Sequence, residues 1–436
     1  MKNVAVVGLG FVGLTLSVVA AKKGYSVYGI DTDEQILKEL GNSKAHFYEK
    51  DIDAAIQTVQ GNSFYFDKNF NSFKEINFGY IIITVGTPIS EDKKLNLNYI
   101  LSALDAIKPI YDGTQLIILR STVSVGTTRK VVLPHLSKMI SKNPESILLA
   151  FCPERTIEGN AINELSELPQ IIGGLNKNSA DYAEEFFRKI TPTILNVESL
   201  EAAELVKLFN NTYRDIEFST GNYFNRIAQS FGINGVSLIK TANYLYPRSK
   251  IALPGLVGGP CLEKDSYILV HEMPENKGKD FVLGARKHNE SIDSQICEWI
   301  IDKLNDNKFR NIGITGMAFK GTPDTSDLRG SPSLNIVNKL KNFGIEKIRL
   351  HDYLISPEEL KTYGDAAESL DSFLENLDIL VILTNNRRYK TLTSNFLKGK
   401  MKNSSVILDV WGVLDFGLDN PIEITTLGDM FLKKNI

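Results

Sequence analysis

The chain has 436 residues, too many for one ordinary hydrophobic core, so two or three domains are expected. Hydrophobic residues make up 43% and charged residues 23%, a globular balance, and the net charge of -3 gives no indication of a nucleic-acid-binding protein. The three cysteines form no CxxC or Cys/His cluster, which argues against a disulfide framework and a metal site. Such sparse cysteines fit a reducing cytoplasm.

The N-terminal stretch predicts a βαβ unit. In chain order it contains a strand at 3–7, the loop Gly8-Leu9-Gly10-Phe11-Val12-Gly13, a helix reaching Lys23 and a strand at 26–30. Asp31 follows the second strand, about 20 residues beyond the glycines, as the dinucleotide fingerprint requires. Its carboxylate can accept hydrogen bonds from a ribose and would repel a 2′-phosphate. The pattern therefore favours NAD over NADP.

The same stretch has an alternative interpretation. Val4 to Ala21 carries no charge, which resembles a signal peptide or a short membrane span. The three glycines interrupt it, and Thr15 and Ser17 make its second half more polar. This spacing favours a strand, a turn and a helix.

Three more strands are expected, at 80–85, 115–119 and 147–151. Polar residues collect where they end, namely Thr87, Thr122 and Glu154. In an open α/β sheet, ligands bind outside the carboxyl ends of the strands. These side chains are therefore candidates for a site, although turn formation and helix capping would select the same residue types.

One long helix is expected from Leu200 to Phe231, a stretch without proline. Lys207 and Asn211 are four residues apart and therefore lie on the same face of the helix. Asn222 is about three turns further along and lies on that face too. This stripe is either a solvated surface or part of a site.

A loop rich in glycine follows at 254–265, with the sequence PGLVGGPCLEKD. Cys261 lies behind two glycines and a proline, just before Lys264 and Asp265. Glycines permit a tight turn and close approach of a ligand, and a nearby cation lowers the pKa of a thiol. Cys261 is either a catalytic nucleophile or a buried, inert cysteine.

A second α/β pattern then begins, with strands expected at 311–315, 348–350, 379–384 and 405–409. It echoes the first, but the run 316–321 (GMAFKG) replaces GxGxxG. We therefore expect an α/β fold of two Rossmann-like doubly wound domains joined by a long central helix. The expected boundaries are 1–197 for an NAD-binding Rossmann domain, 198–300 for a central helical domain with the cysteine loop, and 301–436 for a second Rossmann-like domain that would bind something other than a dinucleotide.

NAD together with a cysteine nucleophile predicts two coupled oxidations, from an alcohol through an aldehyde and a thioester to an acid. Such a scheme needs bases and donors for the developing oxyanions. The chain supplies suitable residues in Lys207, Asn211, Asp265 and Glu158.

The chain resembles the nucleotide-sugar 6-dehydrogenases, the UDP-glucose and GDP-mannose dehydrogenase superfamily, over nearly its whole length. The matching motifs are GLGFVG, VGTP at 85–88, STVSVGTT at 121–128, CPER at 152–155, ELVKLFNNTYRD at 204–215, GGPCLEKD at 258–265 and FKGTPDTSDLRGSP at 319–332. The resemblance implies oxidation of a sugar C6 alcohol to a uronic acid with two NAD, for surface polysaccharide precursors. It also implies that residues 198–300 dimerise through the central helix and that residues 301–436 bind the nucleotide sugar. The protein would be a cytoplasmic homodimer with no membrane insertion.

The resemblance further implies roles for individual residues. Cys261 would carry the thioester, Lys207 and Asn211 would stabilise oxyanions, Asp265 and Thr122 would assist with a water, and Glu158 would serve thioester hydrolysis. Cofactor contacts would come from Gly8, Gly10, Phe11, Val12, Gly13, Asp31, Thr87, Thr122, Lys264 and Arg329. Substrate contacts would come from Glu154, Arg155, Lys207, Asn211, Arg248, Gly258 and Lys320.

Some features depart from the family pattern. The 254–261 loop is one residue shorter than usual, Arg120 precedes Ser-Thr where Lys or Glu is common, and Pro260 precedes the cysteine. The runs NTYRD, PR at 247–248 and CPER favour a UDP-N-acetylhexosamine (mannosamine or glucosamine), whereas Glu158 and the Lys-Asp pair look more like the UDP-glucose branch. An NAD-dependent hydroxyacid dehydrogenase and a non-enzymatic NAD-binding regulator are the rival classes.

Overall fold

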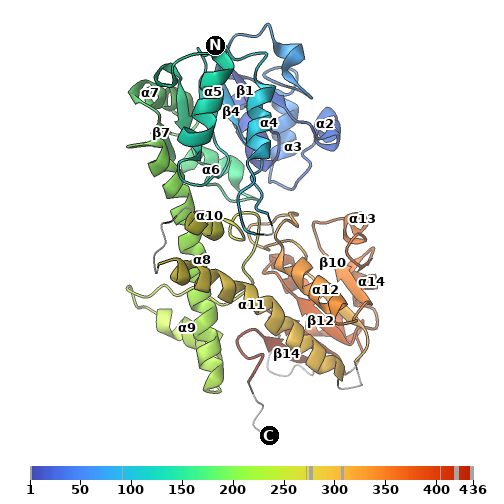
Figure 1. Ribbon diagram of the computed structural model, residues 1–436. Coiled ribbons are helices and arrows are strands. Elements are labelled where there is room, and N and C mark those ends of the chain that lie inside the picture. Colours follow the sequence, from blue (N-terminus) through green and yellow to red (C-terminus); the bar gives the residue numbers. More distant parts are fainter. Residues whose placement is uncertain are drawn as a thin grey trace. The chain divides into compact units, whose positions relative to one another are not determined.

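The computed structural model describes residues 2–90, 92–271, 273, 278–305, 309–402, 404–416 and 422–432 (Figure 1). The chain divides into two compact units, Met1–Asn211 with Tyr267–Pro274, and Thr212–Ser266 with Glu275–Ile436. The three-part division expected from the sequence stays a prediction. The terminal residues 433–436, for which fraying is expected, lie outside the described residues.

The first unit is built on an eight-stranded sheet in the order β3-β2-β1-β4-β5-β6-β7-β8. All neighbours are parallel except β6 and β7. The strands are β1 (Asn3–Val7), β2 (Ser26–Ile30), β3 (Phe64–Asp67), β4 (Phe78–Ile83), β5 (Leu116–Leu119), β6 (Leu149–Phe151), β7 (Gln170–Gly174) and β8 (Ile194–Val197). The strand, turn and helix expected at the N-terminus are confirmed.

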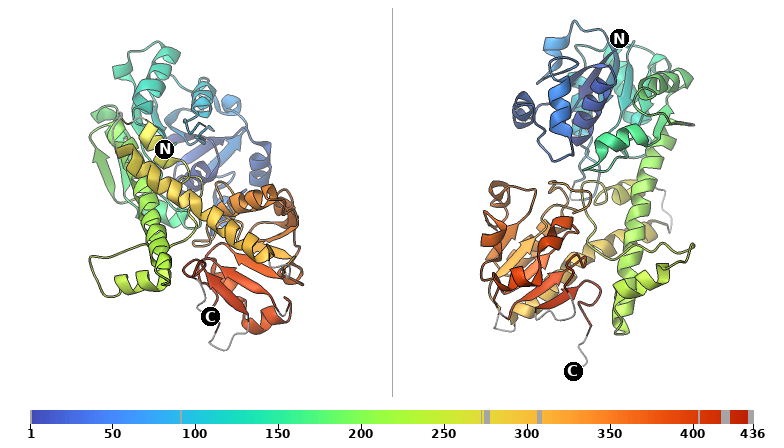
Figure 2. Two further views of the ribbon diagram at one scale, coloured as in Figure 1. Left: turned by 60° about the horizontal axis from the view of Figure 1, so that its bottom comes forward. Right: turned by 180° about the vertical axis from the view of Figure 1, so that it is seen from behind.

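Helices cover both faces of this sheet because alternate strand residues point to opposite sides. Val4 and Val6 join one apolar cluster with α1, α3 and α7, while Ala5 and Val7 join another with α4 and α5. The helices are α1 (Phe11–Lys22), α2 (Glu34–Gly41), α3 (Ile52–Val59), α4 (Asn98–Ala106), α5 (Leu133–Ile140), α6 (Ala161–Glu167) and α7 (Lys177–Phe187). Figure 2 shows the helices of this unit from two further sides.

Helix α8 (Leu200–Ser230) is one uninterrupted helix, as the sequence predicts to within a residue (Figure 1). Its single glycine, Gly221, allows close contact, since a Cβ there would lie 2.2 Å from the carbonyl oxygen of Ala252. The helices that follow are α9 (Gly235–Asn243), α10 (Asp265–His271) and α11 (Gly278–Asn305). Among the described residues, no helix combines the length and the hydropathy needed to cross a membrane.

A second, fully parallel sheet has the order β11-β10-β9-β12-β13-β14. Its strands are β9 (Ile312–Thr315), β10 (Ile348–His351), β11 (Asp365–Ala366), β12 (Ile379–Ile382), β13 (Val406–Asp409) and β14 (Glu423–Thr426). The helices after β9 are α12 (Pro332–Asn342), α13 (Pro357–Leu360), α14 (Leu370–Leu374) and α15 (Ser394–Lys398). Apolar clusters fill both faces of the sheet.

The second sheet repeats the strand order of the first six strands of the first sheet, which confirms two doubly wound α/β folds. The acids after the second strands also correspond, since Asp31 accepts from the Leu9 amide at 2.7 Å and Asp352 from the Met317 amide at 2.8 Å. The turns differ in length. Residues 8–10 separate β1 from α1, whereas residues 316–331 separate β9 from α12. The glycine turn of the second fold therefore does not lead directly into a helix.

Candidate active site

The turn between β1 and α1 has the shape that a dinucleotide phosphate needs. A Cβ at Gly13 would lie 1.9 Å from the carbonyl oxygen of Gly8, so only glycine permits this packing of helix against turn. Gly10 caps α1 without a side-chain hydrogen bond, and a Cβ there would meet nothing within 4 Å. The helix N-terminus and the open space beside it fit a pyrophosphate. Phe11 and Val12 form the first turn of α1.

The second feature is the carboxyl edge of β4 and β5. The Thr87 hydroxyl donates to the carbonyl oxygen of Thr122 at 2.6 Å, so the structure brings these two predicted residues together. Glu204 of α8 fixes the loop after β5 by accepting from the amides of Gly126 and Thr128 at 2.5 and 2.9 Å. Its carboxylate is buried, and this burial raises the pKa of Glu204.

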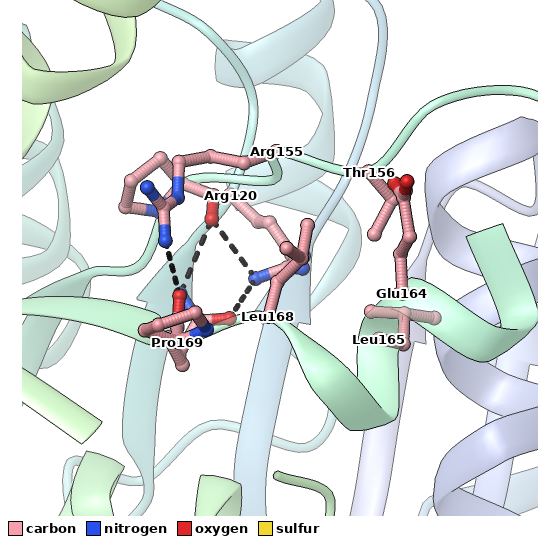
Figure 3. A pocket seen from close by; sticks show the side chains of 9 residues that line it. Arg120, Arg155, Thr156, Glu164, Leu165, Leu168 and Pro169 are labelled. Atoms are coloured by element: carbon pink, nitrogen blue, oxygen red, sulfur yellow. Dashed lines mark hydrogen bonds between the residues drawn. The ribbon is translucent and has the colours of Figure 1, made fainter. Parts of the chain in front are cut away.

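Buried Arg120 supports the loop that carries Glu154 (Figure 3). Its guanidinium donates to the carbonyl oxygen of Cys152 at 3.0 Å and to the side chain of Gln170 at 2.9 Å. Glu154 lies 3.9 Å away, and Arg155 donates to the carbonyl oxygen of Pro169. The cavity beside these residues measures about 10 Å³, room for about one water, so it is not a ligand site.

Glu158 lies on a loop that other carboxylates hold in place. Glu49 accepts from the amides of Gly159 and Ala161 at 2.7 and 2.8 Å. Glu164 accepts from the amide of the residue before Glu158 at 2.7 Å. The backbone on both sides of Glu158 is therefore fixed within the first unit.

Lys207 and Asn211 are buried, each only 7% exposed. This observation contradicts the alternative of a solvated polar stripe. Both lie on α8 in the first unit. A buried lysine and amide on one helical face are preorganised donors, the kind of group that stabilises developing negative charge.

The glycine-rich loop lies against two segments of the second α/β fold. Gly259, at φ +96°, donates its amide to the carbonyl oxygen of Gly330 at 2.8 Å. A Cβ on Gly259 would lie 2.4 Å from the ring of Phe319, and one on Gly258 would lie 2.4 Å from the Gly330 carbonyl oxygen. The structure thus brings the cysteine loop next to the segments that carry Lys320 and Arg329.

Cys261 is the exposed one of the three cysteines. Burial raises the pKa of Cys152 to about 12 and that of Cys297 to about 11. Both therefore remain thiols near neutral pH, and a thiol is a far weaker nucleophile than a thiolate. Cys261 is exposed, which contradicts the alternative of a buried cysteine, and its catalytic role stays a prediction.

The remaining predicted residues of the second unit differ in their surroundings. The Lys264 ammonium lies 3.4 Å from the carboxylate of Asp265, which is fully buried at the start of α10. Arg329 pairs with Asp327 at 2.6 Å, and Arg248 donates to the hydroxyl of exposed Tyr246 at 2.9 Å. Within the described residues, no group of His, Cys, Asp and Glu is placed to hold a metal ion.

Several supporting residues were not predicted from the sequence. Glu204 and Asp215 lie inside a motif that was singled out, but nothing in the pattern indicated that their side chains are buried. Arg286 and Asn289 lie in a charged helix whose sequence matches no motif, yet both are buried. Arg286 donates to the carbonyl oxygen of Leu262 in the cysteine loop, and Asn289 donates to the carbonyl oxygen of Asp215. Only their spacing of three residues, which places them on one face, could have suggested a joint role.

Three family models match the chain in order. The NAD binding domain of the UDP-glucose/GDP-mannose dehydrogenase family matches residues 2–191, its central domain residues 201–291 and its UDP binding domain residues 313–416.

Individual proteins are similar over almost the whole chain. A UDP-N-acetyl-D-mannosamine dehydrogenase of Methanocaldococcus jannaschii is 32% identical, covering 98% of this chain and 97% of its own length. A UDP-N-acetyl-D-mannosamine dehydrogenase of Campylobacter jejuni is 30% identical, covering 90% of this chain and 97% of its own length. The solved structure of a UDP-D-ManNAc dehydrogenase from Pyrococcus horikoshii superposes with a TM-score of 0.87 at 28% identity, covering 99% of this chain and 100% of that one.

Proposed function

Because the chain belongs to the UDP-glucose/GDP-mannose dehydrogenase family, we propose that it oxidises C6 of UDP-N-acetylmannosamine to the uronic acid through a cysteine thioester. It is an NAD-dependent UDP-sugar dehydrogenase, an oxidoreductase. The observation that carries the proposal is that the only exposed cysteine, Cys261, lies on a glycine loop packed against the second nucleotide-binding fold. The sugar is chosen from the names of relatives that are similar over nearly their full lengths.

The proposed reaction has two oxidations and one hydrolysis. The C6 alcohol loses a proton and a hydride and becomes an aldehyde. The Cys261 thiolate then adds to the aldehyde carbon, and the resulting oxyanion takes a proton to give a thiohemiacetal. Loss of a second hydride and a proton leaves a thioester, and water cleaves its C–S bond, which releases the acid and restores the thiol. When bound, NAD accepts the hydride in each oxidation.

We assign the other proposed roles by the chemistry of each side chain. Lys207 and Asn211 donate to the oxygen on C6, where negative charge develops. Asp265 and Thr122 hold a water, and Glu158 acts as a base for thioester hydrolysis. The substrate-binding set is Glu154, Arg155, Lys207, Asn211, Arg248, Gly258 and Lys320.

The residues proposed to hold NAD lie mainly at the carboxyl edge of the first sheet. Gly8, Gly10, Phe11, Val12 and Gly13 form the phosphate turn and the first turn of α1. Asp31 accepts from the adenosine ribose, and Thr87 and Thr122 lie at the neighbouring strand ends. The proposed set also includes Lys264 and Arg329.

We also propose a homodimer formed through α8. Large apolar side chains are exposed along it and along the segment that follows, which a solvated monomer surface rarely shows. They are Phe209, Tyr213, Tyr223, Phe224, Ile227, Phe231, Ile233, Leu238, Tyr244 and Leu245. Three free cysteines fit the proposed cytoplasmic location, where the product would serve a surface polysaccharide.

The test is NADH formation with UDP-N-acetylmannosamine, UDP-N-acetylglucosamine, UDP-glucose and GDP-mannose side by side. We expect the highest kcat/KM with UDP-N-acetylmannosamine and two NADH for each sugar consumed. One NADH per sugar would overturn the four-electron reaction. A preference for UDP-glucose would retain the reaction but overturn the choice of sugar.

A further inference from the structure

A fully buried guanidinium spans the backbone of the cysteine loop. Arg286 of α11 is 2% exposed and donates to the carbonyl oxygens of Val257 and Leu262, both at 3.0 Å. These carbonyls lie on either side of Cys261. One side chain therefore fixes the two ends of the segment that presents the thiol.

Arg286 is itself oriented by a buried carboxylate on α8. Asp215 is 0% exposed and accepts from the Arg286 guanidinium at 2.9 Å. It also accepts from Asn289 at 2.8 Å and from the hydroxyl of Ser266, just beyond the loop, at 2.9 Å. Burial raises the pKa of Asp215, and the charge of Arg286 opposes this shift.

Asn222 holds the start of the same loop. Its side chain accepts from the amide of Gly255 at 2.8 Å and donates to the carbonyl oxygen of Gly255 at 3.1 Å. It also donates to Asn289 at 2.9 Å, which joins it to the Asp215 group. The loop is thus anchored at Gly255, Val257, Leu262 and Ser266 by side chains of α8 and α11.

Arg286 and Asp215 form a buried ion pair, and such a pair contributes little to the stability of a fold. The desolvation of two charges offsets most of their attraction, and apolar residues of similar volume often serve a core as well or better. A guanidinium, however, presents five donors in a rigid fork and can bind two carbonyl oxygens and a carboxylate at once, which an ammonium on a flexible stem cannot reproduce. The group is suited to fixing a backbone conformation.

We infer that Arg286, oriented by Asp215, is a positioning residue that fixes residues 257–262 and thereby places the Cys261 thiol for addition to the aldehyde. The inference rests on the nucleophilic role proposed for Cys261. The two oxidations depend on it unequally. The first removes a hydride from the alcohol and needs no thiol, whereas the second requires the sulfur within bonding reach of C6, where a displacement of 1 Å can cost about 10²-fold in rate.

The test compares Arg286→Lys with Gln229→Leu in the full-length enzyme. Gln229 is a matched control because it is also buried, lies on α8 and donates to a carbonyl, that of Leu427, away from the loop. For Arg286→Lys we expect a loss of at least tenfold in kcat for acid formation, with KM for NAD unchanged. NADH per sugar should fall from two toward one, and the aldehyde should become trappable with a hydroxylamine reagent.

Hydrogen exchange supplies a readout that does not depend on turnover. In Arg286→Lys, exchange of the backbone amides in residues 255–265 should quicken at least tenfold, while Gln229→Leu leaves it at the wild-type rate. Wild-type exchange and two NADH per sugar in folded Arg286→Lys would overturn the inference. If this variant does not fold, Asp215→Asn, a near-isostere that leaves the guanidinium in place, decides by the same two measurements.

The two proposals fail separately. If the wild-type enzyme forms NADH from no nucleotide sugar, the proposed function is wrong, and the exchange rates still decide whether Arg286 fixes the loop. If the wild type forms two NADH per sugar and Arg286→Lys does so equally fast, the proposed function stands and the positioning role is wrong.

Discussion

Access to solvent separates Cys261 from Cys152 and Cys297, which are buried and remain protonated at neutral pH. We expect Cys261→Ser to bind NAD and the nucleotide sugar and to form no acid, because a hydroxyl is a far poorer nucleophile and its adduct would stall as an ester. The measurement is product analysis of the uronic acid alongside NADH. Cys297→Ala is the control and should keep wild-type turnover. Wild-type acid formation by Cys261→Ser would remove the cysteine from the mechanism.

The buried pair Lys207 and Asn211 gives a second prediction for single side chains. Removing one preorganised oxyanion donor costs roughly 10²–10³ in turnover. We therefore expect both Lys207→Ala and Asn211→Ala to lower kcat by about that factor, with little change in the Kd for NAD. Steady-state kinetics together with an NAD titration checks this, and Lys240→Ala, on the exposed face of α9, serves as control. Turnover within a few-fold of wild type in both variants would leave α8 as a scaffold only.

Motifs identified the side chains that we propose to carry chemistry, but not the side chains that hold them in place. Cys261 and Asp31 were predicted because their neighbours in sequence form patterns. Arg286 supports a loop that lies more than twenty residues before it, and one sequence carries no sign of that pairing. Burial of a charge is decided by tertiary packing, which periodicity does not report.

At the scale of the element, the two glycines of the β1–α1 turn should respond very differently to the same substitution. A methyl group at Gly13 meets the backbone oxygen of Gly8 at 1.9 Å, whereas one at Gly10 meets nothing within 4 Å. We expect Gly13→Ala to lower the melting temperature strongly or to prevent folding, since the helix would have to move away from the turn. Gly10→Ala should fold normally and weaken NAD binding, because its methyl group would occupy the space proposed for the pyrophosphate. Thermal unfolding and NAD titration of both variants test this, and equal melting temperatures would contradict it.

Helix α11 contains a carboxyl that should make stability depend on pH. Burial raises the pKa of Asp293 to about 7, while Lys339 and Asn335 oppose the shift. The folded chain therefore retains this proton after the unfolded chain, with an ordinary pKa of about 4, has released it. Its contribution to stability is complete below about pH 4 and is lost as the pH rises to about 7.

We expect Asp293→Asn to remove this dependence. Melting temperatures measured from pH 4 to pH 8 should show the variant gaining on the wild type as the pH rises and exceeding it at pH 8. Asp302→Asn, at an exposed position of the same helix, should follow the wild-type curve. Parallel curves for the wild type and Asp293→Asn would show that the carboxyl titrates normally.

The long elements and the parallel core strands were predicted from the sequence, whereas strands at or next to the edges of the sheets were not. Helix α8 was placed to within a residue because periodicity and the absence of proline agree over its whole length. Strand β7 ends in Gly173 and Gly174, a pair that indicates a turn. In the structure a Cβ at Gly173 would lie 2.4 Å from the carbonyl oxygen of Ser199, so the glycine serves close packing. Strand β14, at the edge of its sheet, reads Glu-Ile-Thr-Thr and has too little apolar pattern to be recognised.

For the whole molecule, the proposed dimer makes a measurable prediction. Tyr213 and Phe224 are 65% and 41% exposed on α8, and aspartate at both positions would place charge in the proposed interface. We expect the double variant Tyr213→Asp/Phe224→Asp to shift the molar mass in light scattering from two chains to one. Phe343→Asp is the control, because Phe343 is 67% exposed after α12, far from α8 in sequence. A wild-type monomer, or a double variant that stays dimeric, would contradict the proposal.

The connection between the first strand and the next helix differs in length between the two α/β folds, and this difference limits how the second fold could be engineered to bind NAD. In the first fold the glycine turn leads directly into α1, whereas in the second the residues 316–331 separate the corresponding turn from α12. The acid after the second strand still binds its own turn in both, through Leu9 in one and Met317 in the other. The second fold differs from the first both in its glycine pattern, with Ala318 in place of the middle glycine, and in the length of this connection. Replacing Ala318 by glycine would therefore not create a new NAD site, and shortening this connection would be the necessary first step.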